Sequence, residues 1–296
     1  MSAASGEATG GSPARSHLYV PGDRADLLTK AFTRGADALI VDLEDAVAPA
    51  AKQTARDTIA DWLTDLGTPP IPVWVRINAG EERAADVAAV AGLASLTGLC
   101  VAKTDAASEL ATLDRELTLR KSSAWLAPLI ESARGVLAAP EIAAAPRVAL
   151  LHLGEIDLAA DVALTPGPDA PELLFARSQV VFASRAARIG APVAPVSADL
   201  GDPARYRATT VALKRLGFFG RACVHPGQVT IANEVFTPTE TELRWAHSLL
   251  EQFADAAAGV FRDSDGNMVD EAVVRRARHI ATLAGHTPAD AAPPAL

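Results

Sequence analysis

The stretch LYVPGDRADLLTKAFTRGADALIVDLEDAV (residues 18–47) contains the unit from which the rest of the fold can be worked out. Two short apolar runs, Leu18–Val20 and Ala38–Val41, flank a segment, Arg24–Arg34, whose apolar residues recur at intervals of three and four. Such runs are typical of buried strands, and such spacing is typical of an amphipathic helix. Polar residues follow each run at once, so the stretch predicts a β-α-β unit with polar groups at the carboxyl ends of its strands.

The same unit repeats along the chain. Eight apolar runs alternate with longer amphipathic segments: Leu18–Val20, Ala38–Val41, Val73–Ile77, Leu99–Ala102, Trp125–Ile130, Val148–Leu153, Ala191–Val196 and Ala222–Val224. Eight such repeats predict the α/β class and a closed TIM (β/α)8 barrel, with all the carboxyl ends at one rim. A doubly wound open sheet is the competing fold, but the glycine-rich phosphate turn that usually follows its first strand is absent.

Composition sets further limits. The net charge of −9 argues against nucleic acid or an anionic membrane as the main partner. The first sixteen residues lack the apolar centre of a signal peptide, and no window of eighteen apolar residues occurs. Cys100 and Cys223 lie in apolar runs, so we expect buried free thiols and a reducing cytoplasm.

We divide the chain into a loose N-terminal tail (1–14), the barrel (15–238), a C-terminal helical segment (239–285) and a second loose tail (286–296). Helices are expected near 239–258 and 270–285, outside the eight repeats.

Two acidic residues at neighbouring strand ends are candidate metal ligands. Glu131 directly follows the fifth apolar run. Asp157 follows the sixth run and lies three residues after Gly154. Neighbouring strands are about 4.8 Å apart, so these carboxylates can share one ion. Mg²⁺ is typically held by one or two carboxylates, with water and substrate at its other positions. The alternative is that Glu131 pairs with Arg134 or caps the next helix.

Arg76, at the end of the third run, is a candidate substrate ligand because a guanidinium can bind a carboxylate or a developing enolate oxygen. It can also be a buried partner for the acidic cluster Asp42, Glu44 and Asp45, and both roles can hold together. We expect Glu44 and Asp45 to bind the substrate. Arg24, which follows the first strand, is expected to bind a cofactor.

Three further residues can have either a catalytic or binding role or a purely structural role. Lys103 can form a Schiff base in principle, but strand-end lysines more often bind a carboxylate or phosphate, so we place it at the substrate. His225 precedes a proline. A histidine before a proline at a helix start is as often a structural residue as a general base. Asp270 precedes a predicted helix, where capping is its default role.

These segments, in order, resemble the citrate lyase beta-subunit family, which includes malyl-CoA and citramalyl-CoA lyases. The matching stretches are LYVPGDRADLLTKAFTRGADALIVDLEDAV (18–47), VRIN (75–78), PLIESARGVLAAPEIAAA (128–145), GEID (154–157), GFFGRACVHPGQV (217–229) and GNMVD (266–270). Their order and spacing agree across roughly residues 15–285.

The resemblance implies a TIM barrel in which Glu131 and Asp157 bind Mg²⁺ and Arg76 contacts substrate. It implies that Asp270 lies on a C-terminal lid closing over a neighbouring subunit's active site, so we expect a homo-oligomer, commonly a trimer. It also implies a Claisen-type lyase that interconverts a 3-hydroxyacyl-CoA with a 2-oxo acid and acetyl-CoA.

The chain departs from the family pattern at several places: Ala102–Ala106, Ala163, Glu271–Ala272 and the loop Ser197–Tyr206. We therefore expect retained lyase chemistry with an altered acyl or 2-oxo-acid pocket. Three alternatives remain: a citrate lyase beta subunit acting on citryl-acyl-carrier protein, a non-catalytic CoA-binding barrel, and an aldolase that uses no thioester.

Overall fold

Seven parallel strands form one sheet in the order β6-β5-β4-β3-β2-β1-β7 in the computed structural model, which describes residues 13–255, 261–262 and 266–284. The strands are β1 (Ser16–Pro21), β2 (Ala38–Asp42), β3 (Val73–Ile77), β4 (Gly98–Val101), β5 (Trp125–Ile130), β6 (His152–Leu153) and β7 (Arg221–Cys223). The expected tails 1–14 and 286–296 lie outside the described residues, apart from residues 13 and 14.

The expected seventh strand is not a regular strand. Residues 191–196 lie between β6 and β7 and join them through two isolated parallel bridges, His152 with Val193 and Ala194 with Arg221. Pro192 and Pro195 lack the N–H that a continuous ladder needs, so only separated backbone bonds form here. These bridges connect the two ends of the sheet, and the prediction of a TIM-barrel α/β fold is confirmed, with this segment in the place of a strand. The sixth run is also shorter than expected, because only His152–Leu153 forms a strand.

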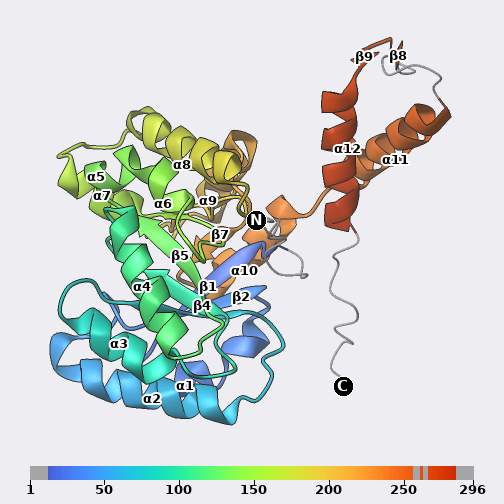
Figure 1. The fold of residues 1–296 in the computed structure, drawn as a ribbon. Helices are drawn as coiled ribbons and strands as arrows, with labels where there is room; N and C mark the ends of the chain where they lie inside the picture. The colour runs from blue at the N-terminus through green and yellow to red at the C-terminus, as the bar shows by residue number, and fades with distance from the viewer. Residues whose placement is uncertain (1–12, 256–260, 263–265, 285–296) are drawn as a thin grey trace. The chain divides into compact units, whose positions relative to one another are not determined.

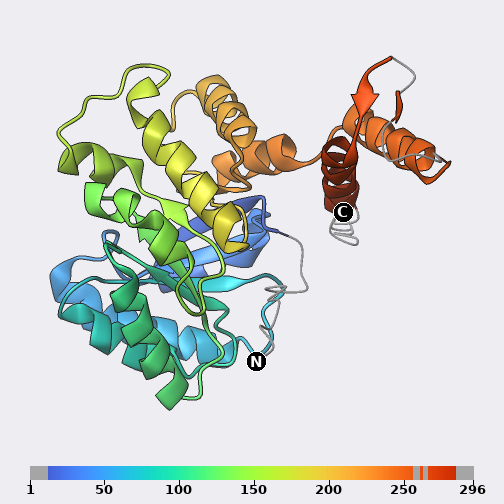
Figure 2. The same cartoon turned by 45° about the horizontal axis from the view of Figure 1, so that its top comes forward.

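Helices surround this curled sheet on its outer side (Figures 1 and 2). They are α1 (Ala25–Leu28), η1 (Ala31–Arg34), η2 (Pro49–Ala51), α2 (Lys52–Asp65), α3 (Glu82–Val90), α4 (Ala107–Leu119), α5 (Ala133–Leu137), α6 (Ala139–Ala143), α7 (Glu155–Asp161), η3 (Pro171–Leu173), α8 (Leu174–Ala187), α9 (Pro203–Leu216) and α10 (Pro226–Phe236). No helix within the described ranges is long and apolar enough to cross a membrane.

Strand alternation decides which residues reach the site. Along β2, Leu39 and Val41 join the core between sheet and helices, whereas Ala38 and Ile40 belong to a smaller cluster inside the ring. Side chains alternate along a strand, so Asp42 continues the inward set at the carboxyl end. Asp42 lies in register with Arg76 on β3, which places these two charges side by side at the rim. Cys100 and Cys223 are buried free thiols, as expected.

Residues from Thr237 onward form a second compact unit. It contains the helices α11 (Glu240–Asp255) and α12 (Glu271–Ala284) and the short antiparallel pair β8 (Phe261–Arg262) and β9 (Met268–Val269). Its core contains Ala246, Leu249, Val269, Val274 and Ala277. Asp270 stands between β9 and α12, within this unit.

Candidate active site

Arg76 forms a buried ion pair with Asp42. Its Nε and Nη2 atoms each donate a hydrogen bond of 2.6 Å to a different oxygen of the Asp42 carboxylate. Nη1 reaches Glu44 at 2.9 Å and Asp45 at 3.4 Å. The guanidinium also lies 5.1 Å from the centre of the Tyr19 ring. Burial opposes the charge, but Asp42 and Glu44 outweigh it and raise the pKa of Arg76 far above its usual range. The arginine is therefore a fixed positive charge.

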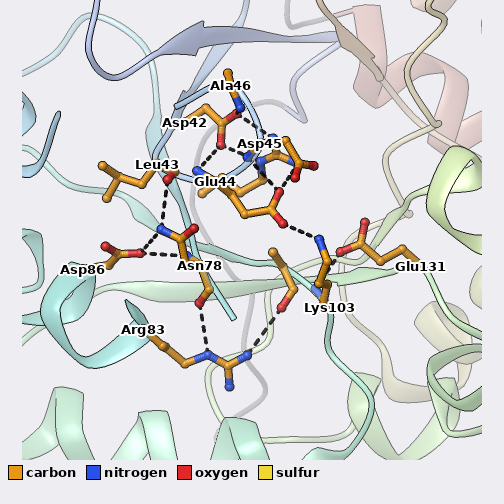
Figure 3. A network of polar contacts seen from close by, with 12 residues as sticks. Asp42, Leu43, Glu44, Asp45, Ala46, Asn78, Arg83, Asp86, Lys103 and Glu131 are labelled. Carbon is orange, nitrogen blue, oxygen red and sulfur yellow. Dashed lines mark hydrogen bonds and ion pairs between the residues drawn. The ribbon is translucent and has the colours of Figure 1, made fainter. Parts of the chain in front are cut away.

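The loop after β2 wraps around the same carboxylate. Asp42 accepts backbone N–H bonds from Glu44 at 2.8 Å and from Ala46 at 3.1 Å (Figure 3). These bonds add to the two that it accepts from Arg76. The Asp-Leu-Glu-Asp-Ala sequence thus turns back over its first residue. Both proposed roles of Arg76 are compatible with this geometry, since Arg76 pairs with the acidic cluster and also lines the cavity described below.

Lys103 connects the acidic loop to the next carboxylate. Its Nζ forms an ion pair with Glu44, and its backbone N–H donates a bond of 2.6 Å to Glu131 Oε1 (Figure 3). Lys103 has a φ of 52°, in the left-handed region that residues other than glycine rarely adopt. Burial lowers the pKa of Lys103, but the bond to Glu44 and the charges of Glu44, Glu131 and Asp45 together outweigh burial, so the pKa is raised. A protonated amine is a poor nucleophile, which disfavours the Schiff-base role.

A supporting network beneath this loop was not singled out from the sequence. Lys52 Nζ donates to the Leu43 and Glu44 carbonyls and to Asn78 Oδ1, at 2.6, 2.7 and 2.8 Å. Asn78 in turn donates through its backbone and side chain to Asp86, at 2.7 Å each. The VRIN motif includes Asn78, but nothing in the helix sequence distinguishes Lys52 from a solvent-exposed lysine.

Glu131 is a buried carboxylate, 4% exposed, that follows β5. Burial raises its pKa to about 7; the Lys103 backbone and charge oppose this shift, whereas Asp157 and Glu44 add to it. Its Oε2 atom accepts no hydrogen bond from any residue that the structure describes. Neither alternative role is seen among the described residues: Ser132, not Glu131, caps α5 by accepting the Gly135 N–H, and Glu131 forms no ion pair with Arg134.

Gly154 permits the close contact between β6 and Glu131. A Cβ atom at this position would lie 2.7 Å from both Cβ and Oε2 of Glu131. Asp157, on the first turn of α7, is exposed and lines the same cavity as Glu131. No group of three or more His, Cys, Asp or Glu residues suited to a metal occurs in the described chain. Two carboxylates with open positions fit Mg²⁺, and a buried carboxylate with an unbonded oxygen fits a cation.

The cavity itself has a volume of about 530 Å³ and lies at the rim of the barrel. Arg76, Glu131 and Asp157 all line it, together with Asp45. Tyr19 and His152 also line it and were missed, because they sit within apolar runs where only the strand register shows which side faces inward. His152 is fully buried, edge-on to His17 at 5.6 Å between ring centroids, and burial keeps its pKa well below the usual value.

Three other predicted residues form local contacts. Arg24 is half exposed and pairs with Asp26 at 2.9 Å, and it does not line this cavity. His225 accepts the Gly227 N–H on its Nδ1 at 3.0 Å, which is a turn-forming role. Asp270 caps α12 by accepting the N–H groups of Ala272 at 2.9 Å and Val273 at 3.1 Å. Capping does not exclude chemistry, and the roles of Arg24 and Asp270 stay predictions.

Comparisons with known proteins agree with this arrangement. The family model described as HpcH/HpaI aldolase/citrate lyase matches residues 15–226. A citrate lyase subunit beta-like protein of Deinococcus radiodurans is 36% identical over 92% of this chain and 96% of its own. The mitochondrial citramalyl-CoA lyase of Mus musculus is 28% identical, covering 92% and 86% respectively.

A solved structure is also similar. The protein CitE of Mycobacterium tuberculosis, in complex with magnesium, acetoacetate and coenzyme A, superposes with a TM-score of 0.77 at 28% identity. The match covers 93% of this chain and 98% of that one.

Replacing Asp42 tests the buried ion pair. We expect Asp42→Asn to lower the free energy of unfolding by about 3 kcal/mol or more, because Arg76 loses its paired carboxylate while remaining buried. Asp45→Asn is the control, since its side chain is 58% exposed and lies 3.4 Å from Arg76; it should cost less than about 1 kcal/mol. Urea unfolding measures both, and equal losses would contradict the central place of Asp42.

Glu131 should make the stability of the metal-free protein depend on pH. Its folded-state pKa of about 7 lies above the ordinary 4.5, so the folded protein holds this proton more tightly than the unfolded chain. The resulting stabilisation is present below about pH 4.5 and is lost as the pH rises through about 7. Between about pH 5 and pH 8, Glu131→Gln should gain roughly 2–3 kcal/mol relative to the parent protein.

Urea unfolding in the presence of a chelator measures this difference. Glu141→Gln, at an exposed position, is the matched control and should follow the parent protein at every pH. A Glu131→Gln difference that stays constant with pH would contradict the shifted titration.

Proposed function

Because this chain belongs to the HpcH/HpaI aldolase/citrate lyase family, we propose that it is a magnesium-dependent carbon–carbon lyase acting on a 3-hydroxyacyl-CoA thioester. The products are a 2-oxo acid and acetyl-CoA, and the reverse condensation uses the same groups. The observation that carries the proposal is one cavity lined by the permanently charged Arg76, the buried Glu131 carboxylate and Asp157. The similar CitE structure, which holds magnesium, acetoacetate and coenzyme A, supports this choice of ligands.

Glu131 and Asp157 are the proposed ligands of Mg²⁺. When bound there, the ion supplies Lewis-acid polarisation of the substrate oxygens. Glu131 is held in place by the Lys103 N–H and by its contact with Gly154. Because Lys103 pairs with Glu44, its positive charge also stays close to these carboxylates.

Arg76 is the proposed binder of developing negative charge. In cleavage, the C3 hydroxyl gives its proton to water, C3 becomes the keto carbon of the 2-oxo acid as the bond between C2 and C3 breaks, and the electron pair of that bond forms the thioester enolate. A fixed guanidinium stabilises that anion without reorganising, an effect of roughly 3 kcal/mol for one such donor. Asp42 holds the guanidinium in one orientation through two bonds, which leaves its Nη1 edge for Glu44, Asp45 and a ligand.

Asp270 is the proposed proton donor to the enolate carbon, and the proton acceptor in condensation. We propose that the unit containing it closes as a lid over the site of a neighbouring subunit in a homo-oligomer such as a trimer, which would exclude water. Arg24 is the proposed contact for the anionic part of the cofactor. The acyl group is left open, because the loop Ser197–Tyr206 departs from the family pattern.

A citrate lyase beta subunit is the second candidate, favoured by the 36% identity to a protein named as similar to that subunit. In that case the thioester is citryl-acyl-carrier protein, and the metal and arginine chemistry is unchanged.

Turnover of a substrate panel tests the function. We expect malyl-CoA or citramalyl-CoA to release a 2-oxo acid, measured as its phenylhydrazone, in a reaction that a chelator stops. Glu131→Gln should lose Mg²⁺ binding in calorimetry together with turnover, because one of two protein ligands is gone. Glu141→Gln should keep both.

The same panel separates the alternatives. Citryl-acyl-carrier protein as the only substrate assigns the second candidate, and free hydroxy acids as the only substrates assign an aldolase. Mg²⁺ binding with no turnover of any of these would refute the lyase proposal in favour of a non-catalytic barrel.

Asp270→Asn isolates proton transfer from folding. Asparagine caps a helix as well as aspartate does, so α12 should stay intact in circular dichroism. Turnover and solvent deuterium exchange into acetyl-CoA should fall by about 10²–10⁴-fold, as for loss of a general acid or base. If Asp270 acts on a neighbouring subunit, mixing this variant with Glu131→Gln should restore part of the activity. Unchanged exchange in the Asp270→Asn protein would remove the residue from the mechanism.

A further inference from the structure

Arg221 is a buried arginine that points away from the reaction cavity. It begins β7, where Ala222 and Val224 line the reaction cavity and Arg221 takes the opposite, outward direction. The residue is 3% exposed, and its guanidinium stacks on the Tyr206 ring at 4.1 Å from the ring centre. It is therefore fixed in a closely packed site between β7 and α9.

Most of its donors have acceptors. Nε donates to the Pro195 carbonyl at 3.0 Å, and Nη1 donates to the Tyr206 carbonyl, Thr209 Oγ1 and Thr210 Oγ1 at 3.1, 3.0 and 2.6 Å. Nη2 donates to no residue that the structure describes. The two N–H groups of Nη2, on one edge of this rigidly held guanidinium, are thus available to donate hydrogen bonds to a ligand.

Arg221 also lacks a counter-ion among the described residues. Arg56, Arg76 and Arg177 each hold a carboxylate within 3 Å, whereas no carboxylate of the described residues forms an ion pair with Arg221. Burial therefore lowers the pKa of Arg221, although the distant Glu155 opposes this. Glu155 instead bonds through both of its oxygens to Arg177, at 2.5 and 2.9 Å. A buried charge without a partner is costly, so this site is suited to an anion.

A second cavity lies at this position. It has a volume of about 480 Å³ and is lined by Arg221, Arg177, Arg205 and Thr209, among others. Three acidic residues also line it, and each has a partner. Both oxygens of Glu155 bond to Arg177, Asp199 accepts the Gly201 N–H at 3.0 Å and lies 4.0 Å from Arg205 Nη1, and Asp202 accepts the Arg205 N–H at 2.9 Å. Glu155, Ile156 and Val196 line both this cavity and the reaction cavity, so the two adjoin.

We propose that this second cavity is a binding site for a small oxyanion, a carboxylate or a phosphate, held by the free Nη2 edge of Arg221. The anion has two possible sources: a free ion in solution, or the distal carboxylate of an oxo acid that extends from the neighbouring reaction cavity. The site itself does not depend on the proposed lyase function; only the second source does.

Calorimetry with inorganic phosphate and with succinate, at constant ionic strength, tests the site on the full-length chain. We expect the parent protein to bind at least one probe, and Arg221→Gln to bind it roughly tenfold or more weakly, as for loss of a charged hydrogen bond. Ala198→Phe fills the cavity from an exposed loop position without touching the Arg221 bonds, and it should weaken binding to a similar degree. Arg207→Gln, an exposed arginine of α9 outside the cavity, should change nothing.

Several results would overturn the site. They are no binding of either probe to the parent protein, equal binding by Ala198→Phe and the parent, or a loss in Arg207→Gln as large as that in the other two variants. Because Ala198→Phe leaves the buried arginine intact, this arm stays decisive even if Arg221→Gln does not fold.

A matched pair of oxo acids separates the two sources. 2-Oxoglutarate and 2-oxopentanoate have the same chain length and differ in a distal carboxylate against a methyl group. With Mg²⁺ present, Ala198→Phe should weaken only 2-oxoglutarate if the anion is part of the substrate. If the anion is a free ion, Ala198→Phe should still lose phosphate or succinate binding. The difference in affinity between 2-oxoglutarate and 2-oxopentanoate should then be the same in this variant as in the parent protein.

Discussion

The ion pair between Arg76 and Asp42 is the interaction on which the rest of the rim depends. Two short bonds join the carboxyl ends of β2 and β3, and the same carboxylate gathers the backbone of the following loop. Glu44 then reaches Lys103, and Lys103 reaches Glu131, so that charges from four strand ends form one connected set (Figure 3). Buried pairs of this kind contribute little net stability but penalise strongly the loss of either partner. Here the ion pair fixes the orientation of Arg76, so that the guanidinium cannot turn away from the cavity.

Most of the candidate site could be predicted from the residues at the carboxyl ends of the strands. Arg76, Glu131 and Asp157 were singled out because polar residues directly after buried runs converge in a barrel, and all three line one cavity. The curled parallel sheet was predicted for a similar reason, since repeated apolar runs depend on local pattern alone. These inferences needed no knowledge of side-chain direction.

What could not be predicted depends on direction and on register. Tyr19 and His152 stand in apolar runs, and only strand pairing shows that they face the interior. Arg221 belongs to a family-like motif, yet its outward direction and its lack of a carboxylate partner follow from packing against α9. The expected strand at 191–196 was wrong because hydrophobic pattern outweighed two prolines, although the missing N–H groups of Pro192 and Pro195 were visible in the sequence.

Those two prolines have a consequence for how the barrel can vary. The wall between β6 and β7 is joined by isolated bridges, whereas the seven strands themselves pair side by side in one sheet. Val196, at its end, borders both cavities. Local opening there disturbs neither Arg76 nor Glu131, which lie on the continuous side of the sheet. Amino-acid changes that accommodate larger ligands can therefore accumulate along this seam, while the acidic and basic groups of the rim keep their positions.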